Sequence, residues 1–345
     1  MAVVIVKDSL RAAVEASSGG KQTVLYDAQG NPSIMNIIPK FNLQDIDDRL
    51  GTGVHPAFIK GGVEKSEIFV STYKNTILDG RAISMPNQSP AIVTRSAARA
   101  ACVAKGPGWH LMSNHEWAAI ALWCAKNGFV PHGNTSYGRS HKAAYETGIR
   151  VDRRAPGVTS GSPQTLTGSG PNTWNHDLSS NGIADMVGSY WEHVDLFELR
   201  DGRVYTPIDN NFELAEEDWP AQDIYFDSPA VGDNEGGNNL GAPILAGSVT
   251  KSTTDSDYCG ATWSSLAAAS GYTVPLLAKQ LMIAPLAAND ELSALSEGYC
   301  WVRNSGTRIA LRAGYFSYHD AAGLGCLVMR YDVTYTIAFR SAFID

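Results

Sequence analysis

Helical patterning is strong at only two places in this chain of 345 residues, and that scarcity restricts the fold most. Ser113 and Glu116 are spaced as a capping box, in which the two side chains satisfy each other's free backbone N–H groups. An apolar stripe follows at helical spacing, and we predict a helix over residues 114–127. A second is predicted over 90–105, capped by Ser89 with Pro90 first. Elsewhere short strand signals alternate with polar turns without a regular βαβ order, which predicts an α+β protein.

The chain is expected to divide into a small N-terminal module, residues 1–50, and one large domain, 51–345. The module is predicted to hold strands at 2–6, 22–26 and 33–38, a turn at 27–31 and a short helix at 8–16. It is too small for assured independent stability, so it should pack on the main domain or on another subunit. Two Gly- and Ser-rich stretches, 129–180 and 228–255, are interpreted as long loop insertions.

Charge and hydropathy exclude several classes of function. Lys and Arg number 27 against 35 Asp and Glu, and a net charge of −8 argues against a protein held to nucleic acid by phosphate contacts. No stretch approaches the roughly 20 apolar residues of a membrane span, so membrane insertion is not expected. The N-terminus lacks a basic segment before its apolar run and does not predict a signal peptide.

Familiar catalytic and metal-binding motifs are incomplete or missing. His115-Glu116 begins like a zinc-protease helix, but Ala119 stands where the second imidazole is needed. The five cysteines form no C-x-x-C pair and are expected to be mostly buried, with a Cys124–Cys300 bridge left open. The acidic run 213–218 beside Trp219 and the oxygen-rich loop 233–239 are either solvated or Ca²⁺-binding. No cofactor is required by this reasoning, and metal content is left open.

The last 34 residues have the composition of a binding surface. Four tyrosines stand there among Ser, His, Arg and Asp, and tyrosine supplies large contact area at low entropic cost. The alternative is a pair of ordinary strands with half of these side chains in the core. Leu327 and Met329 alternate with Val328 and Arg330, so one face is expected to be buried and the other exposed.

Four segments in the same order resemble the domain shared by formylglycine-generating enzymes and their relatives, a decorated C-type lectin fold. GWHLMSNHEW at 108–117 is similar to that family's G-Y-R-L-P-T-E-A-E-W, and NGIADMVGSYWE at 181–192 to its N-G-x-x-D-M-x-G-N-V-W-E-W. LRAGYF at 311–316 and IAFR at 337–340 stand where L-R-G-G-S-W and I-G-F-R are expected, with Phe316 replacing the usual Trp. The resemblance covers roughly residues 55–345 and implies that fold, with two helices, short antiparallel strands and long loop insertions.

One branch of that family, the variable proteins of diversity-generating retroelements, carries a diversified C-terminal region on the lectin fold. Ala322-Gly323, Leu327 and Met329 fit its fixed positions, and the first 50 residues resemble pieces of phage tail-fibre proteins. In that branch diversity arises at Asn codons, whose first two bases cannot be changed to give Lys, Glu, Gln, Met or Trp. Between Tyr315 and Tyr335 only Met329, on a fixed position, is of an excluded type.

This resemblance implies a non-catalytic receptor-binding protein of a phage or archaeal virus, made in the cytoplasm and carried on the virion as a tail fibre or tip. Its partner would be a protein or glycan on a target cell, and its variable region about residues 312–340. The candidate ligand contacts are Tyr315, Ser317, Tyr318, His319, Asp320, Val328, Arg330, Tyr331, Asp332, Val333 and Tyr335. The candidate scaffold residues are Trp117, Asp185, Met186, Trp191, Glu192, Leu327, Met329, Phe339 and Arg340, with Asp185 and Glu192 expected to make structural hydrogen bonds.

Two alternatives stay open. The oxidase branch of the family needs two redox-active cysteines shortly after the R-G-G-S motif, but residues 315–325 contain none, with Cys300 before and Cys326 after. Catalysis is therefore not expected, although an oxidase remains an alternative, because fold analogy alone does not decide function. The other alternative is a glycan lectin of fixed specificity.

Overall fold

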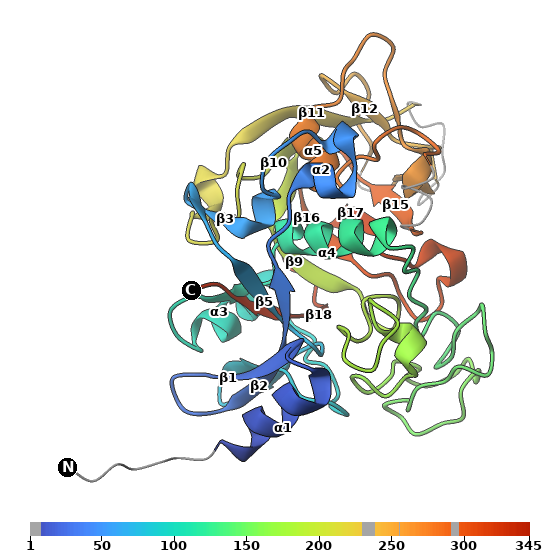
Figure 1. Cartoon of the computed structure of the whole chain (residues 1–345). Helices are drawn as coiled ribbons and strands as arrows, with labels where there is room; N and C mark the ends of the chain where they lie inside the picture. The colour runs from blue at the N-terminus through green and yellow to red at the C-terminus, as the bar shows by residue number, and fades with distance from the viewer. Residues whose placement is uncertain (1–7, 230–238, 255, 291–296) are drawn as a thin grey trace.

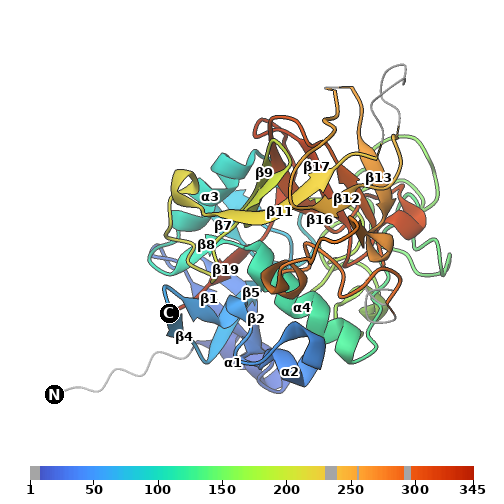
Figure 2. The same cartoon turned by 90° about the horizontal axis from the view of Figure 1, so that it is seen from above.

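The computed structural model describes residues 8–229, 239–254, 256–290 and 297–345. It is a mixed α+β protein, as predicted, with two main sheets and few helices (Figures 1 and 2). None of the helices in these ranges has the length and apolar character needed to span a bilayer. The predicted strand at 2–6 lies outside the described residues.

The smaller sheet joins the two ends of the chain. Its strand order is β1 (Gln22–Tyr26), β2 (Pro32–Pro39), β5 (Glu67–Ser71), β19 (Ser341–Phe343) and β8 (Trp109–Leu111). β1 and β2 match the two strands predicted at 22–26 and 33–38. β2 pairs with β5 from Met35 opposite Ser71 to Pro39 opposite Glu67. The N-terminal strands therefore pack on the main domain, through a sheet that crosses the expected boundary at residue 50.

The larger sheet is a curled half-barrel of ten strands (Figure 2). Its order is β13 (Cys259–Thr262), β15 (Tyr299–Val302), β17 (Leu327–Tyr331), β16 (Thr307–Arg312), β9 (Glu192–Arg200), β10 (Arg203–Tyr205), β11 (Ala221–Asp227), β12 (Ile244–Ala246) and β14 (Ala267–Ala268), with β18 (Ala338–Phe339) also paired to β9. Two hairpins, β3 (Ile59–Lys60) with β4 (Val63–Glu64) and β6 (Thr76–Leu78) with β7 (Arg81–Ile83), lie outside both sheets.

The helix α4 (Asn114–Lys126) packs against β9 and carries the centre of the core. The capping box is present: the Ser113 hydroxyl accepts the Glu116 N–H at 3.1 Å, and the Glu116 carboxylate accepts the Ser113 N–H at 2.9 Å. The predicted apolar stripe is fully buried, together with side chains of both sheets. This helix was thus predicted to within one residue.

The helix predicted from Pro90 begins later, as α3 (Arg95–Val103), because Thr94 caps it instead of Ser89. Val93 forms a β-bridge with Ile337, and that pairing holds the preceding residues extended. α1 (Ser9–Ser18) matches the short helix predicted near the N-terminus. The remaining helical segments of the described ranges are short. They are α2 (Leu43–Ile46), α5 (Leu276–Gln280) and six 3₁₀ turns, Asp48–Leu50, Pro56–Phe58, Asn172–Trp174, Glu216–Asp218, Trp263–Ser265 and His319–Ala321.

Candidate ligand-binding face

A buried ionic network lies under the C-terminal strands. Glu192 at the start of β9 accepts hydrogen bonds from Lys74 Nζ at 2.6 Å and from Arg340 Nε at 2.7 Å, and all three side chains are buried. Lys74 also donates to the carbonyls of Asp185 and Tyr190, and Arg340 to that of Ala184. Two cations thus hold the loop 184–190 against β9.

Asp185 completes this arrangement. Its carboxylate accepts the Gly168 N–H at 2.7 Å, its backbone has a φ of 60°, and burial raises the pKa of its carboxyl group. The structural hydrogen bonds expected of Asp185 and Glu192 are therefore both present. The whole predicted scaffold set is buried, which for its apolar members means the hydrophobic core.

Trp191 stands at the centre of what we call the tyrosine cluster: Tyr315, Tyr318, Tyr331 and Tyr335 arranged around this indole. The ring centroids of the four tyrosines lie 5.2, 5.4, 5.5 and 6.0 Å from that of Trp191. Tyr331 and Tyr335 stack on each other at 3.8 Å. Trp191 is only 4% exposed, whereas all four tyrosines are half-buried. A buried indole therefore carries four rings that are each partly exposed to solvent.

The structure separates the candidate contacts by exposure. Exposed are His319, Asp320, Asp332 and Val333, while Ser317 and Arg330 are half-buried like the tyrosines. Val328 does not belong to this set, because its side chain is 0% exposed. It lies in a small apolar cluster with Trp191, Ile309 and Leu311. The predicted alternation of buried and exposed side chains along β17 is therefore wrong at Val328, because the face opposite Leu327 and Met329 is itself covered by aromatic rings.

Sequence reasoning missed the residues that extend this face from distant segments. Trp301 on β15 packs against Tyr318 with 4.9 Å between the ring centroids, and the ring centroid of Tyr299 lies 4.6 Å from that of Trp301. The Arg330 guanidinium lies 5.3 Å from the ring centre of Tyr258 and 5.0 Å from that of Tyr331. The only sequence signal was the aromatic alternation of Tyr299 and Trp301. Their place beside β17 follows from parallel pairing that sets Trp301 opposite Val328.

A hollow of about 390 Å³ adjoins the face at the candidate residues His319 and Asp320. Its other wall comes from the loop after α4, where His141 Nε2 lies 2.6 Å from the Asp320 carboxylate. Burial lowers the pKa of His141, although the Asp320 carboxylate opposes that effect. The hollow offers hydroxyl, guanidinium, imidazole and carboxylate groups next to the half-buried aromatic rings.

The tyrosines of the face are neutral hydrogen-bonding groups. Burial is the main cause that raises the pKa of Tyr315, Tyr318 and Tyr335, so their hydroxyls stay protonated at neutral pH. Such a hydroxyl can both donate and accept, and that of Tyr315 accepts a hydrogen bond from Gln164 Nε2 at 3.0 Å. The face therefore combines apolar ring surface with polar tips.

All five cysteines are free and buried, so no Cys124–Cys300 bridge exists. Burial raises the pKa of the Cys300 thiol well above its usual range and that of Cys326 to about 12. Thiols with such pKa values are protonated at neutral pH and are poor nucleophiles.

The two oxygen-rich segments have different outcomes. In the acidic run, Glu216 pairs with Arg95 at 2.7 Å and with Arg99, and Glu213 pairs with Lys60. Residues 233–238 of the other segment lie outside the described ranges. Among the residues that the structure describes, no group of three or more His, Cys, Asp or Glu side chains is arranged to hold a metal ion.

A scan against models of known protein families gave no match, and a search of curated protein sequences gave none either.

Proposed function

We propose that this chain is a non-catalytic ligand-binding protein of the variable C-type lectin type, whose tyrosine cluster and neighbouring side chains recognise a protein or glycan on a target cell. The observation that carries the proposal is the placement of four half-exposed tyrosines on one buried indole, backed by a buried ionic network. Rigid aromatic side chains with polar tips are typical of binding surfaces.

The separation between buried scaffold residues and exposed candidate contacts favours a diversified surface. Leu327 and Met329 lie in the large core, while His319, Asp320, Asp332 and Val333 stand in solvent, where substitution costs little stability. A scaffold of this kind tolerates change at its surface positions without losing its fold. Together with the resemblance of four sequence segments, this supports a retroelement variable protein on a virion as the specific form of the proposal.

A binding role is favoured over the oxidase alternative by the state of the cysteines. Cys300 and Cys326 are the thiols nearest the motif at 311–316, and both are fully buried with raised pKa values. A thiol oxidation needs an accessible thiolate with a partner thiol. An assay for oxidation of a substrate cysteine, with Cys300→Ser and Cys326→Ser variants, would contradict the proposal if it found turnover that requires these thiols.

The direct test is binding of the whole chain to a glycan array and to envelope preparations from a panel of bacterial and archaeal cells. Where binding occurs, the double change Arg330→Ala and Tyr331→Ala should weaken it at least about 30-fold, the effect of losing a hot spot. Tyr145→Ala is the matched control, because that tyrosine is 86% exposed and is neither a candidate contact nor a lining residue of the hollow. Equal binding by the wild type and the double variant would refute the assignment of the face.

Diversification itself is tested at the gene. The proposal expects a near-copy of the 3′ end of the coding sequence beside a reverse-transcriptase gene, with differences confined to template adenines. Isolates should differ at Ser317, His319, Asp320, Arg330 and Tyr331 and agree at Leu327 and Met329. A locus without such a repeat would leave a lectin of fixed specificity as the better explanation, and binding to one sugar that survives changes at Tyr318 and Arg330 would establish it.

A further inference from the structure

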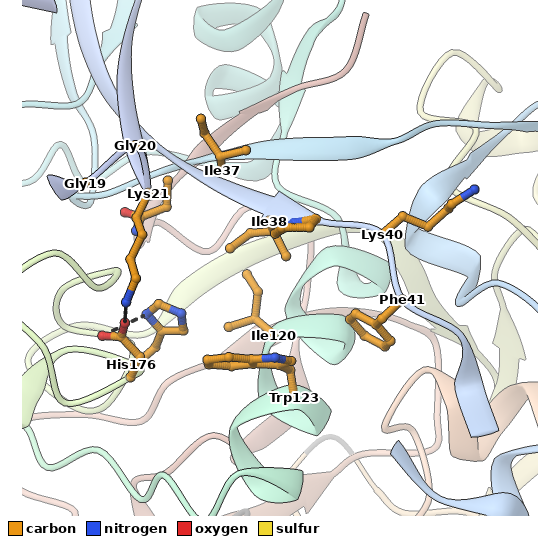
Figure 3. Close-up of a pocket in the computed structure, with 13 residues that line it drawn as sticks. Gly19, Gly20, Lys21, Ile37, Ile38, Lys40, Phe41, Ile120, Trp123 and His176 are labelled. Atoms are coloured by element: carbon orange, nitrogen blue, oxygen red, sulfur yellow. Dashed lines mark ion pairs between the residues drawn. The ribbon is translucent and has the colours of Figure 1, made fainter. Parts of the chain in front are cut away.

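A cavity of about 470 Å³ lies between β2 and α4 and shares no residue with the candidate ligand-binding face (Figure 3). Its apolar wall comes from two separate segments: Ile38 and Phe41 from β2 and the residues after it, and Ile120 and Trp123 from α4. Trp123 packs against Phe129 and His176, whose ring centroids lie 5.5 and 5.7 Å from that of the indole. Volumes of this size and apolar linings are typical of small-molecule sites.

One end of the cavity carries a hydrogen-bond donor on a largely buried side chain, that of His176. His176 Nδ1 accepts the Ile183 N–H at 2.8 Å, and the side chain is 6% exposed. Burial lowers the pKa of His176 to about 4, so the ring is neutral at physiological pH and carries its proton on Nε2. Within the described residues this N–H has no hydrogen-bond partner, and Figure 3 shows the imidazole beside Ile120 and Trp123.

The charges at the rim are compensated by other side chains. Lys21 Nζ lies 3.7 Å from the Asp177 carboxylate, and Lys40 Nζ lies 2.9 Å from that of Glu64. Ser179 donates two further hydrogen bonds to Asp177, from its N–H and its hydroxyl. A charged ligand would have to compete with these partners, so the cavity suits a neutral molecule.

We infer that this cavity is a second binding site, for a neutral molecule with a flat apolar ring system and one carbonyl-type acceptor. The ring system would lie against Trp123 and between Ile38 and Ile120, and the acceptor would take the proton of His176 Nε2. A ligand acceptor would replace the solvent that reaches this N–H, and a hydrogen bond made in a cavity from which water is excluded is stronger than one made in water. This site is independent of the proposed function.

The test uses two dyes, the neutral naphthalene ketone prodan and its 6-propyl analogue, in which a methylene replaces the ketone carbonyl, titrated into the whole chain and followed by fluorescence. Wild-type protein is expected to bind prodan saturably with a blue-shifted emission, and about threefold to tenfold more tightly than the ketone-free dye, the range of one hydrogen bond. His176→Asn keeps an acceptor for the Ile183 N–H but removes the Nε2 donor. It should abolish the preference for the ketone and retain ring binding.

Ile38→Trp fills the cavity and should weaken binding of both dyes at least tenfold, with Phe41→Trp as the second filling variant if Ile38→Trp unfolds early. Tyr145→Ala, at an exposed position outside the lining of the cavity, and Tyr331→Ala, on the other site, should leave both affinities within twofold of wild type. The inference is overturned if the wild type binds neither dye up to their solubility limits, or if the folded filling variants bind as well as the wild type. It is also overturned if His176→Asn keeps the ketone preference.

Discussion

Replacing Glu192 by Gln should destabilise the protein strongly, because the change removes a buried charge and leaves the shape almost unaltered. Glu192 is the carboxylate shared by Lys74 and Arg340, and the pKa of its carboxyl group is lowered by Arg340 and then by Lys74, against the opposing effect of burial. In the native protein two buried cations face the carboxyl groups of Glu192 and Asp185. In Glu192→Gln the same two cations face only the carboxyl group of Asp185.

The magnitude follows from the burial of all three partners. Removing one member of a buried ion pair costs about 3–5 kcal/mol of unfolding free energy, since the remaining charge is left uncompensated away from water. Lys74 and Arg340 cannot turn to solvent, because their hydrogen bonds to backbone carbonyls fix them in place. We therefore expect the full cost for Glu192→Gln. The double variant Lys74→Met/Glu192→Gln should cost at least about 1 kcal/mol less than the two single changes added together.

Urea unfolding, followed by tryptophan fluorescence and circular dichroism, measures these free energies. The matched control is the exposed pair of Lys40 and Glu64, 2.9 Å apart, for which Lys40→Met and Glu64→Gln should each change the unfolding free energy by less than about 1 kcal/mol. A cost below about 1 kcal/mol for Glu192→Gln, or strict additivity in the double variant, would refute the reasoning.

Three further outcomes are expected. Trp191→Ala should lower the free energy of unfolding in urea by about 3–5 kcal/mol, whereas Tyr145→Ala should change it by less than about 0.5 kcal/mol. Similar losses of unfolding free energy for the two variants would contradict the central role of the indole. Val328→Asp should prevent stable folding in a thermal melt, because the carboxylate would be buried unpaired, while the exposed Val333→Asp should melt like the wild type. Burial lowers the pKa values of His115 and His193 to about 4, below the unfolded value of about 6.5, so between these pH values the unfolded chain binds more protons and the unfolding free energy falls as pH falls. Each histidine contributes up to about 3 kcal/mol to that loss, and urea midpoints that stay constant from pH 7 to pH 4 would rule it out.

Several features were predictable from the sequence because they depend on neighbours along the chain. Residues that are neighbours in the sequence determine these features. They are the capping box at Ser113 and Glu116, the apolar stripe on α4, and the strands β1 and β2. The α+β class followed from the same local patterns. The predicted start of α3 was wrong because Val93 pairs with Ile337, a contact between residues far apart in the sequence.

The ligand-binding face shows the same division. The sequence by itself picked out the C-terminal tyrosines and the buried positions Leu327 and Met329 on β17, because composition and period are visible in one strand. Only the tertiary structure gathered those tyrosines around Trp191, set Trp301 and Tyr258 beside them and buried Val328 beneath them. Exposure depends on which distant rings cover a strand, and strand pairing between remote segments decides that.

The cavity lined by Trp123 and His176 could not be predicted from the sequence, because it too depends on contacts between distant segments. Its walls come from separate segments spread over residues 19–177, and none carries a recognisable motif. The sequence determined the local elements and the kinds of side chain available. The pairing of β2 with β5 and the packing of α4 against the large sheet decided which side chains meet, because burial and charge compensation are properties of the folded interior.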